Sequence, residues 1–249
     1  MRKYCINIGN SRVAVCEAPV DATTRVERYE RAQWLSHWQL PDAATAVAAC
    51  VVPAMREALQ ERYGDRIRFI GIADYPQLDF SNYDYRTLGA DRIANAAAVH
   101  QLAGKAPVMA IDCGTGLNSV AVDGNGAFRG GVILPGRRPA RAALACATAQ
   151  LPDIPENEVR KVTPLALNTR DAIASGVDLG IAGAIEYIIR ATRKQPGMAD
   201  CIVYLCGGDA EYLAQLIEPA LGVRLAPFSL TLYGIHLVAS LRSATGARG

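Results

Sequence analysis

Short polar turns follow three apolar segments of the chain, and their composition suits them to phosphate. They come after Ile8, after Asp112 and after Cys206, and they are rich in Gly, Ser, Thr and Asn. Glycine leaves backbone N–H groups uncovered, so such a turn can surround phosphate oxygens. One glycine turn is most often only a turn. Two related turns and a third glycine pair together favour a nucleotide held in a cleft between two lobes.

A carboxylate and a guanidinium adjoin at Asp91 and Arg92, just after Gly89. At the start of a helix, Asp91 could accept a proton from a substrate hydroxyl while Arg92 holds a substrate carboxylate. The same two residues could instead form a helix cap with an exposed salt bridge. The residues alone leave both interpretations open.

Asp112 ends an apolar segment that begins at Val108. A carboxylate at the end of a buried strand is costly unless a cation or hydrogen-bond donors meet it. Asp112 is therefore a candidate cation ligand. The alternative is that it accepts hydrogen bonds from the N–H groups of the turn that follows it.

Strands must carry these turns. Residues 4–8 and 13–16 predict a strand, a tight turn and a strand, and the pattern returns at 108–113 and 117–122, with a third strand at 127–134. The repeat of Asn7-x-Gly-Asn-Ser as Asp112-x-Gly-Thr-Gly indicates an ancient duplication. We therefore expect two lobes, 1–106 and 107–249.

Helical stretches lie between and after the strands. They are expected at 88–103, at 169–194, from Asp209 to about 217 and at 229–241, with a further strand at 201–206. Gly176, Gly180 and Gly183 share one face of the long helix, which favours close packing against a neighbouring helix or sheet, through a lobe contact or a subunit contact. The alternation of meanders and helices predicts an α/β protein.

Composition excludes several classes of protein. The chain has 249 residues, 51% of them hydrophobic, and 26 Lys+Arg against 24 Asp+Glu, a net charge of +2. These values exclude a disordered tail, and scattered charge argues against nucleic-acid binding. The apolar runs predict no membrane span, and the basic N-terminus has no signal-peptide pattern, so we expect a cytoplasmic protein. Seven cysteines without a Cys-x-x-Cys pair predict reduced thiols.

Several motifs occur in a characteristic order: Leu88-Gly-Ala-Asp-Arg, Asp112-Cys-Gly-Thr, Gly130-Gly-Val-Ile-Leu-Pro-Gly, Thr148-Ala-Gln-Leu-Pro, Asn168-Thr with Ser175-Gly, and Gly207-Gly-Asp-Ala. In this order and spacing the chain resembles the type III pantothenate kinase family. The resemblance implies two duplicated ribonuclease H-like lobes of the sugar kinase, heat-shock protein 70 and actin type.

The resemblance also implies a reaction: ATP-dependent phosphorylation of pantothenate to 4'-phosphopantothenate, the first step toward coenzyme A. It implies Mg²⁺, K⁺ or NH₄⁺, and a homodimer. Asp91 matches the catalytic base, and Asp112 matches a ligand of the monovalent cation. The matching substrate positions are Gly89, Ala90, Arg92 and Thr169, with Tyr83 as a further contact. The matching ATP positions are Asn7, Gly9, Asn10, Ser11, Gly114 and Thr115.

The chain departs from the family pattern in its first motif, where Asn7 stands in place of the usual aspartate. An amide adds no negative charge toward Mg²⁺, so the sequence predicts weaker metal binding. A diverged member that acts as a binding or regulatory protein is therefore an alternative. A kinase for a different hydroxyl acceptor is another, because Tyr83 is out of register with the family's tyrosine.

Overall fold

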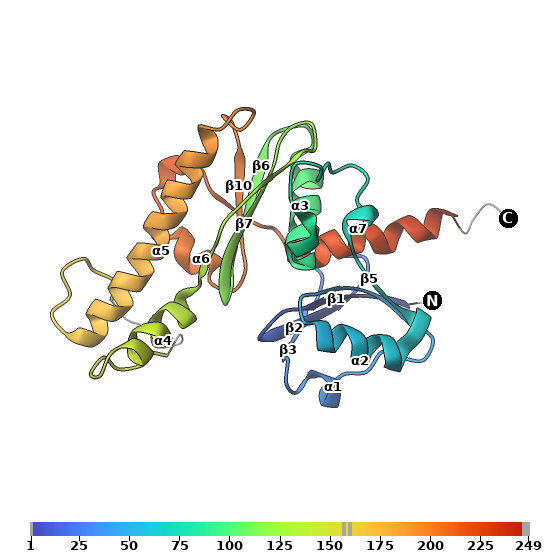
Figure 1. Cartoon of the computed structure of the whole chain (residues 1–249), viewed down its shortest axis with the longest axis horizontal. Coiled ribbons are helices and arrows are strands. Elements are labelled where there is room, and N and C mark those ends of the chain that lie inside the picture. Colours follow the sequence, from blue (N-terminus) through green and yellow to red (C-terminus); the bar gives the residue numbers. More distant parts are fainter. Residues whose placement is uncertain (1, 156–157, 159–160, 246–249) are drawn as a thin grey trace. The chain divides into compact units, whose positions relative to one another are not determined.

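A computed structural model describes residues 2–155, 158 and 161–245 (Figure 1). The chain forms two units: unit 1 comprises Met1–Lys105, Gly124–Arg129 and Ala226–Gly249, and unit 2 comprises Ala106–Asp123 and Gly130–Leu225. The C-terminal stretch belongs to unit 1, so neither unit is one continuous segment. The division into two duplicated lobes, 1–106 and 107–249, stays a prediction.

Unit 1 contains a five-stranded sheet with the strand order β3-β2-β1-β4-β5. Its central strand, β1, pairs antiparallel with β2 and parallel with β4. Alternate residues of β1 and β2 are apolar, and they turn one side of the sheet toward a core that includes Trp34. The strands are β1 (Arg2–Ile8), β2 (Arg12–Glu17), β3 (Glu27–Glu30), β4 (Ala44–Cys50) and β5 (Ile67–Phe69).

Four helices complete unit 1: α1 (Trp34–His37), α2 (Pro53–Tyr63), α3 (Ala90–Ala103) and α7 (Leu230–Thr245). The alanine-rich α3 is buried along most of its length, and α7 packs closely against it. A Cβ on Gly234 would lie 2.1 Å from the Ala94 carbonyl oxygen, so only glycine permits this approach. The Thr231 hydroxyl donates to Asn95 Oδ1 at 2.8 Å. Two helices distant in sequence therefore form one buried pair.

The sheet of unit 2 repeats this order around its own central strand, β6. β6 pairs antiparallel with β7 and parallel with β10, and β11 lies beyond β10. The repeated meander predicted from the sequence is therefore present in the fold. The strands of unit 2 are β6 (Val108–Cys113), β7 (Gly116–Val122), β9 (Ile133–Pro135), β10 (Ile202–Cys206) and β11 (Arg224–Leu225).

The strand predicted at 127–134 is wrong in its extent, because the segment forms two short strands, β8 (Phe128–Gly130) and β9. Gly130 has a φ of +90°, and a Cβ on Gly131 would lie 1.9 Å from the Ser119 carbonyl oxygen. The glycine pair therefore turns the chain where the apolar pattern alone predicted continuity.

The helices of unit 2 are α4 (Arg137–Ala147), α5 (Thr169–Arg193) and α6 (Ala210–Ala214). The Asn168 side chain caps α5 by accepting from the Asp171 N–H at 2.9 Å. By length and apolar composition alone, α5 could cross a membrane. However, one of its faces is buried with the strands of unit 2, and that face contains the charged Asp178. These features are those of a core helix.

The three α5 glycines do not pack against another helix or sheet in the described part of the chain, and their subunit contact stays a prediction. Leaving aside the helix's own backbone, an added Cβ at Gly176, Gly180 or Gly183 would meet nothing within 4 Å in the part of the chain that is described. These glycines leave an exposed strip on α5.

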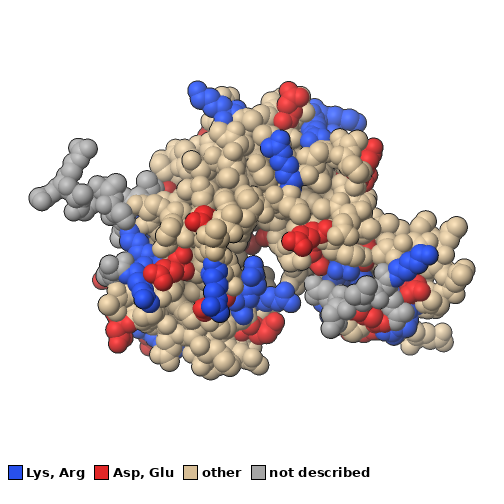
Figure 2. Space-filling view, turned by 180° about the vertical axis from the view of Figure 1, so that it is seen from behind, with Lys and Arg blue, Asp and Glu red and all other residues tan. Residues whose placement is uncertain are grey.

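Basic and acidic side chains are intermingled on the face shown in Figure 2, with uncharged residues between them. That distribution agrees with a net charge of only +2. All seven cysteines are free thiols, and most of them are buried.

Candidate active site

The Asp91 carboxylate lies at the start of α3 and accepts a hydrogen bond from the backbone of the first turn. Gly89 is the N-cap residue, and Asp91 lies in the first turn. Asp91 Oδ1 accepts a hydrogen bond from the Arg92 N–H at 2.8 Å. A Cβ on Gly89 would lie 2.5 Å from the same oxygen, so glycine at this position makes room for the carboxylate.

Burial raises the pKa of Asp91, although the Arg92 N–H and the Arg92 charge partly oppose that shift. A carboxylate with a raised pKa is a stronger base when it is ionised. Asp91 therefore combines a fixed position with the basicity that proton abstraction requires.

Arg92 and Tyr83 meet beside this carboxylate. The Arg92 guanidinium donates from Nη1 to the Tyr83 hydroxyl oxygen at 3.3 Å and lies 5.9 Å from the Tyr83 ring centroid. Tyr83 in turn makes an edge-to-face contact with Phe128, with centroids 5.0 Å apart. The structure thus brings together the candidate residues Tyr83, Gly89, Ala90, Asp91 and Arg92.

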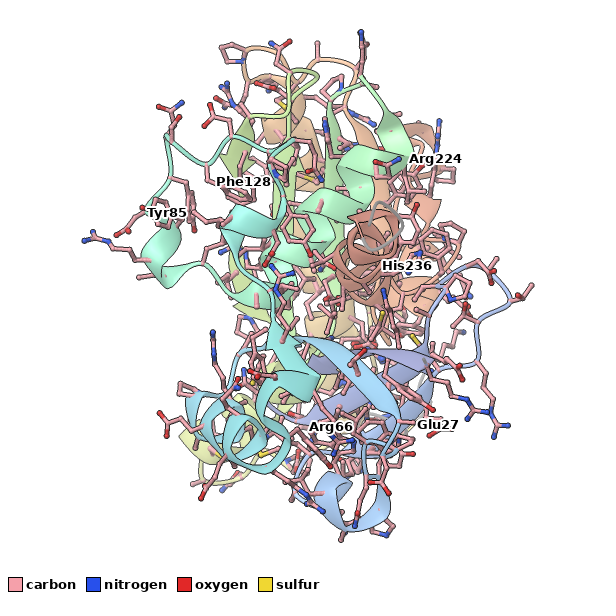
Figure 3. The ribbon with its side chains drawn as sticks, turned by 90° about the vertical axis from the view of Figure 1, so that its right-hand side faces the viewer. Glu27, Arg66, Tyr85, Phe128, Arg224 and His236 are labelled. Carbon is pink, nitrogen blue, oxygen red and sulfur yellow. The ribbon has the colours of Figure 1, made fainter. Side chains whose placement is uncertain are left out.

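An open hollow of about 560 Å³ is lined by the loop 81–86, which contains Tyr83. Figure 3 shows Tyr85 on this projecting loop, with Phe128 nearer the body of the unit. Tyr85 is 49% exposed, and Arg86 pairs with Asp84 at 2.8 Å. Among the residues that line the hollow, Tyr83 links it to Arg92 through its hydroxyl group.

The first glycine turn follows β1 in unit 1. The Gly9 N–H donates to the Arg12 carbonyl at 3.0 Å and closes the turn. Arg31 supports it from outside, with Nε donating to the Asn10 carbonyl at 2.6 Å and its N–H to the Ser11 carbonyl at 2.8 Å. Just before the turn, Asn7 Oδ1 is buried and accepts no hydrogen bond from the described residues.

The second glycine turn follows β6 in unit 2, and two other glycines pack against it. The Gly136 N–H donates to the Thr115 carbonyl at 2.9 Å, and a Cβ on Gly136 would lie 2.0 Å from the Gly114 carbonyl oxygen. Gly207, with a φ of +93°, lies so close that a Cβ there would be 2.5 Å from Asp112 Oδ1. The segments that contain Gly114, Gly136 and Gly207 therefore meet at the end of β6.

Asp112 has a second oxygen-bearing side chain as its neighbour on the adjacent strand. Asn118 of β7 is the register partner of Asp112. Its Oδ1 is buried and has no hydrogen-bond donor among the described residues. Those residues contain no group of three or more His, Cys, Asp or Glu side chains arranged to hold a metal. A cation at Asp112 would therefore need amide, backbone or ligand oxygens in addition to that carboxylate.

A buried ion network behind this turn was missed by the sequence analysis. Arg137 donates from Nε and Nη2 to the two oxygens of Asp178 at 2.9 and 3.0 Å, and from Nη1 to Asp209 at 2.9 Å. Arg141 and the Tyr212 hydroxyl also donate to Asp178, at 2.9 and 2.7 Å. Two signals could have revealed it: the single charged residue, Asp178, within the apolar segment 172–185, and two arginines one helical turn apart.

Thr169, the remaining candidate substrate residue, is the first residue of α5 and is exposed. It belongs to unit 2, as do Asp112, Gly114 and Thr115, whereas the residues around Asp91 and the turn at Gly9 belong to unit 1. The candidate residues therefore form one set in each unit.

The sequence is similar to known kinases. A family model described as type III pantothenate kinase matches residues 4–191. A type III pantothenate kinase of Synechococcus elongatus is 34% identical over 253 residues, covering 96% of this chain and 97% of that protein. One from Rubrobacter xylanophilus is 38% identical over 162 residues, covering 63% of this chain and 60% of that protein.

Solved structures share the fold. A Baf family protein from Campylobacter jejuni, described as a putative transcriptional activator, has a TM-score of 0.67 at 20% identity, covering 97% of this chain and 99% of that chain. MreB5 of Spiroplasma citri, solved with AMPPNP, has a TM-score of 0.53 at 11% identity, covering 98% and 97%. At these identities the likeness shows the fold alone, which is of the actin, sugar kinase and heat-shock protein 70 type.

Proposed function

The chain belongs to the type III pantothenate kinase family, the enzymes that phosphorylate pantothenate with ATP in coenzyme A biosynthesis, and we propose how its own residues carry out that reaction. The observation that carries the proposal is the half-buried carboxylate of Asp91 at the start of α3, next to Arg92 and Tyr83. These three side chains supply a base, a cation and a hydroxyl at one place.

Asp91 is the general base in this proposal. Its carboxylate takes the proton of the acceptor's primary hydroxyl, and burial makes it basic enough to do so. Arg92 holds the carboxylate of pantothenate. Tyr83 fixes the guanidinium through the 3.3 Å hydrogen bond, and Gly89 leaves room for the Asp91 carboxylate.

The glycine turns bind the nucleotide. Gly9, Asn10 and Ser11 in unit 1, and Gly114 and Thr115 in unit 2, offer backbone N–H groups and hydroxyls to phosphate oxygens. When bound, ATP supplies the phosphoryl group, and phosphoryl transfer depends mainly on positioning and electrostatic stabilisation.

Two buried amide oxygens fit bound cations. A buried acceptor without a donor costs free energy, and a metal ion or metal-bound water removes that cost. Asn7 Oδ1 would meet Mg²⁺ or one of its waters, while Asp112 with Asn118 would hold K⁺ or NH₄⁺. Asn7 brings no negative charge, so Mg²⁺ relies more on the phosphates than it would beside an aspartate.

The exposed strip on α5 supports a homodimer. Its glycines carry no side chain, so a second copy could approach the α5 backbone closely, and Tyr187 on this strip is 74% exposed. Thr169 begins the strip, so a second copy seated there would lie next to a substrate residue. The strip consists of Thr169, Ala172, Gly176, Gly180, Gly183 and Tyr187.

Light scattering after size-exclusion chromatography tests this assembly. We expect a dimer for the native chain, a monomer for Gly180→Arg, and a dimer for the control Glu211→Arg on α6. A monomeric native chain would contradict the homodimer.

Coupled ATP turnover with pantothenate, Mg²⁺ and K⁺ or NH₄⁺ tests the function. We expect turnover by the native chain, its loss in Asp91→Asn, and its retention in Asp65→Asn, a control at an exposed carboxylate of unit 1. Turnover that appears only in Asn7→Asp would favour a diverged binding or regulatory protein. Turnover with another hydroxyl compound only would favour a different acceptor.

The proposed setting is the cytoplasm, where pantothenate and ATP are both available to a metabolic enzyme. A cell fractionation that recovers the chain with the membranes would contradict this setting.

A further inference from the structure

Five side chains of unit 2 form a charge-balanced network in the interior. Its two guanidinium groups, Arg137 and Arg141, are 7% and 1% exposed, and its two carboxylates, Asp178 and Asp209, are 0% and 8% exposed. Tyr212 completes it: its hydroxyl donates to Asp178, and its ring lies 4.0 Å from the Arg137 guanidinium. Charges this deeply buried persist only when they are paired and hydrogen-bonded.

Each guanidinium nitrogen of Arg137 donates a hydrogen bond to a carboxylate of this network. Nε and Nη2 bind Asp178, and Nη1 binds Asp209. These ion pairs hold the guanidinium against the two carboxylates, and Gly136, the residue before Arg137, binds the turn after β6.

The two ends of the Arg137–Asp209 ion pair are fixed to the turn after β6. Arg137 directly follows Gly136, whose N–H donates to the Thr115 carbonyl at 2.9 Å. Asp209 uses its own N–H to bind the Cys113 carbonyl at 3.0 Å. A shift of Arg137 or Asp209 would therefore be transmitted to the backbone on both sides of Gly114.

Asp178 fixes Arg137 in turn. Burial by itself would raise the pKa of Asp178, but hydrogen bonds from Arg137 and Tyr212 and the charges of both arginines outweigh it and lower the pKa. The carboxylate stays ionised, and its two oxygens hold the planar guanidinium in one orientation.

We propose that Arg137 is a positioning residue for the nucleotide: held by Asp178 and Asp209, it sets the position of the Gly114–Thr115 turn that binds the phosphates of ATP. This role rests on the proposed function of that turn. The ion network then affects the binding of the nucleotide. It does not affect the binding of the acceptor, which contacts Arg92 and Tyr83.

Matched arginine substitutions test the proposal. Arg137→Lys keeps the charge but loses the planar fork, and Arg138→Lys makes the same change at the neighbouring exposed pair with Asp153. The measurements are the dissociation constant of MgATP, by titration without acceptor, and the KM for pantothenate. A small displacement of the Gly114–Thr115 turn would misalign the groups that bind phosphate. We therefore expect Arg137→Lys to weaken MgATP binding by about 10–100-fold. We expect its KM for pantothenate to stay within about twofold, and Arg138→Lys to change neither value.

A milder variant covers the case in which Arg137→Lys fails to fold. Tyr212→Phe removes one donor to Asp178 and leaves all the ion pairs, so we expect a smaller loss of MgATP affinity in the same direction. Unchanged MgATP affinity in a folded variant, or an equal loss of affinity for both substrates, would overturn the positioning role. Failure of the native chain to bind MgATP would instead overturn the proposed nucleotide site itself.

Discussion

The central strands of the two units end alike but are supported differently. β1 and β6 each lie between an antiparallel and a parallel neighbour, and each carries a polar residue one position before its end, Asn7 in one and Asp112 in the other. In unit 1 that residue is uncharged, and Arg31 supports the following turn from the surface. In unit 2 the residue is a carboxylate, and the turn rests on glycine backbone and buried ions.

This contrast separates topology from chemistry. The strand order recurs in the two sheets, whereas the charged groups beside their central strands do not. A surface contact can be lost or replaced at small cost, but a buried charge cannot lose its partner without a large one. We therefore expect changes at the unit 2 turn to have larger effects than equivalent changes at the unit 1 turn.

The largest expected effect is at the acceptor side of unit 1. Asp91→Asn should lower kcat by about 100–10,000-fold, because it removes the proposed general base. The melting temperature at pH 7 should not fall. The folded-state pKa of Asp91 lies above its unfolded value, so the ionised carboxylate costs stability at neutral pH, and asparagine removes that cost. Steady-state kinetics and calorimetry measure the two quantities. A large fall in melting temperature would mean that Asp91 serves mainly as a structural cap.

The next effect compares the two turns directly. Gly136→Ala places a Cβ 2.0 Å from a backbone oxygen, whereas Gly9→Ala places one at 3.2 Å. We expect Gly136→Ala to destabilise the protein by about 1–3 kcal/mol and to raise the KM for ATP by about tenfold or more. Gly9→Ala should cost less than about 1 kcal/mol. Similar losses of stability for the two variants would show that the turns are equally constrained.

A smaller effect is expected when the missing charge is restored. Asn7→Asp should lower the Mg²⁺ concentration for half-maximal activity by about tenfold or less, because a carboxylate attracts Mg²⁺ more strongly than an amide. Asn118→Asp in unit 2 is the comparison, and it should change the response to K⁺ more than the response to Mg²⁺. An unchanged Mg²⁺ dependence in Asn7→Asp would show that residue 7 does not contribute to Mg²⁺ binding.

The smallest effect concerns the order of two titrations. The pKa of Asp91 is raised by burial, while that of Asp178 is lowered by its donors in spite of burial. As the pH falls, Asp91 should be protonated first, and kcat/KM should decline while the fold persists. The stabilisation from Asp178 is present above its unfolded pKa and is lost only as the pH falls through its lower folded value. A pH–rate profile and circular dichroism over the same range compare the two. Loss of activity and of structure at the same pH would contradict this order.

The sequence was sufficient for the parts of the fold that depend on local pattern. The repeated strand, turn and strand around Gly9 and Gly114, and the long helix from Thr169, depend on apolar period and on turn residues, which are visible in a single chain. The interruption at Gly130 and Gly131 depends on the Ser119 carbonyl, which lies on another strand. No local pattern reports such a contact.

The candidate site divides in the same way. Asp91 and Arg92 are adjacent in sequence, so their joint role could be suggested from the sequence, and Tyr83 is near enough to be included. Arg137, Asp178 and Asp209 are far apart in the chain, so no local pattern shows that they pair with one another. Their burial and their pairing depend on the tertiary structure, because they require α4, α5 and the start of α6 to pack together.

The pairing of α3 with α7 has a consequence for the order in which the protein matures on the ribosome. Unit 2 ends at Leu225, so its whole sequence has been synthesised before α7 is made. Unit 1 begins first, yet α3 lacks the helix that covers Ala94 until the last part of the chain emerges. The unit that is translated first is therefore completed last, and a nascent chain stopped before Leu230 would expose the alanine face of α3 to chaperones and proteases.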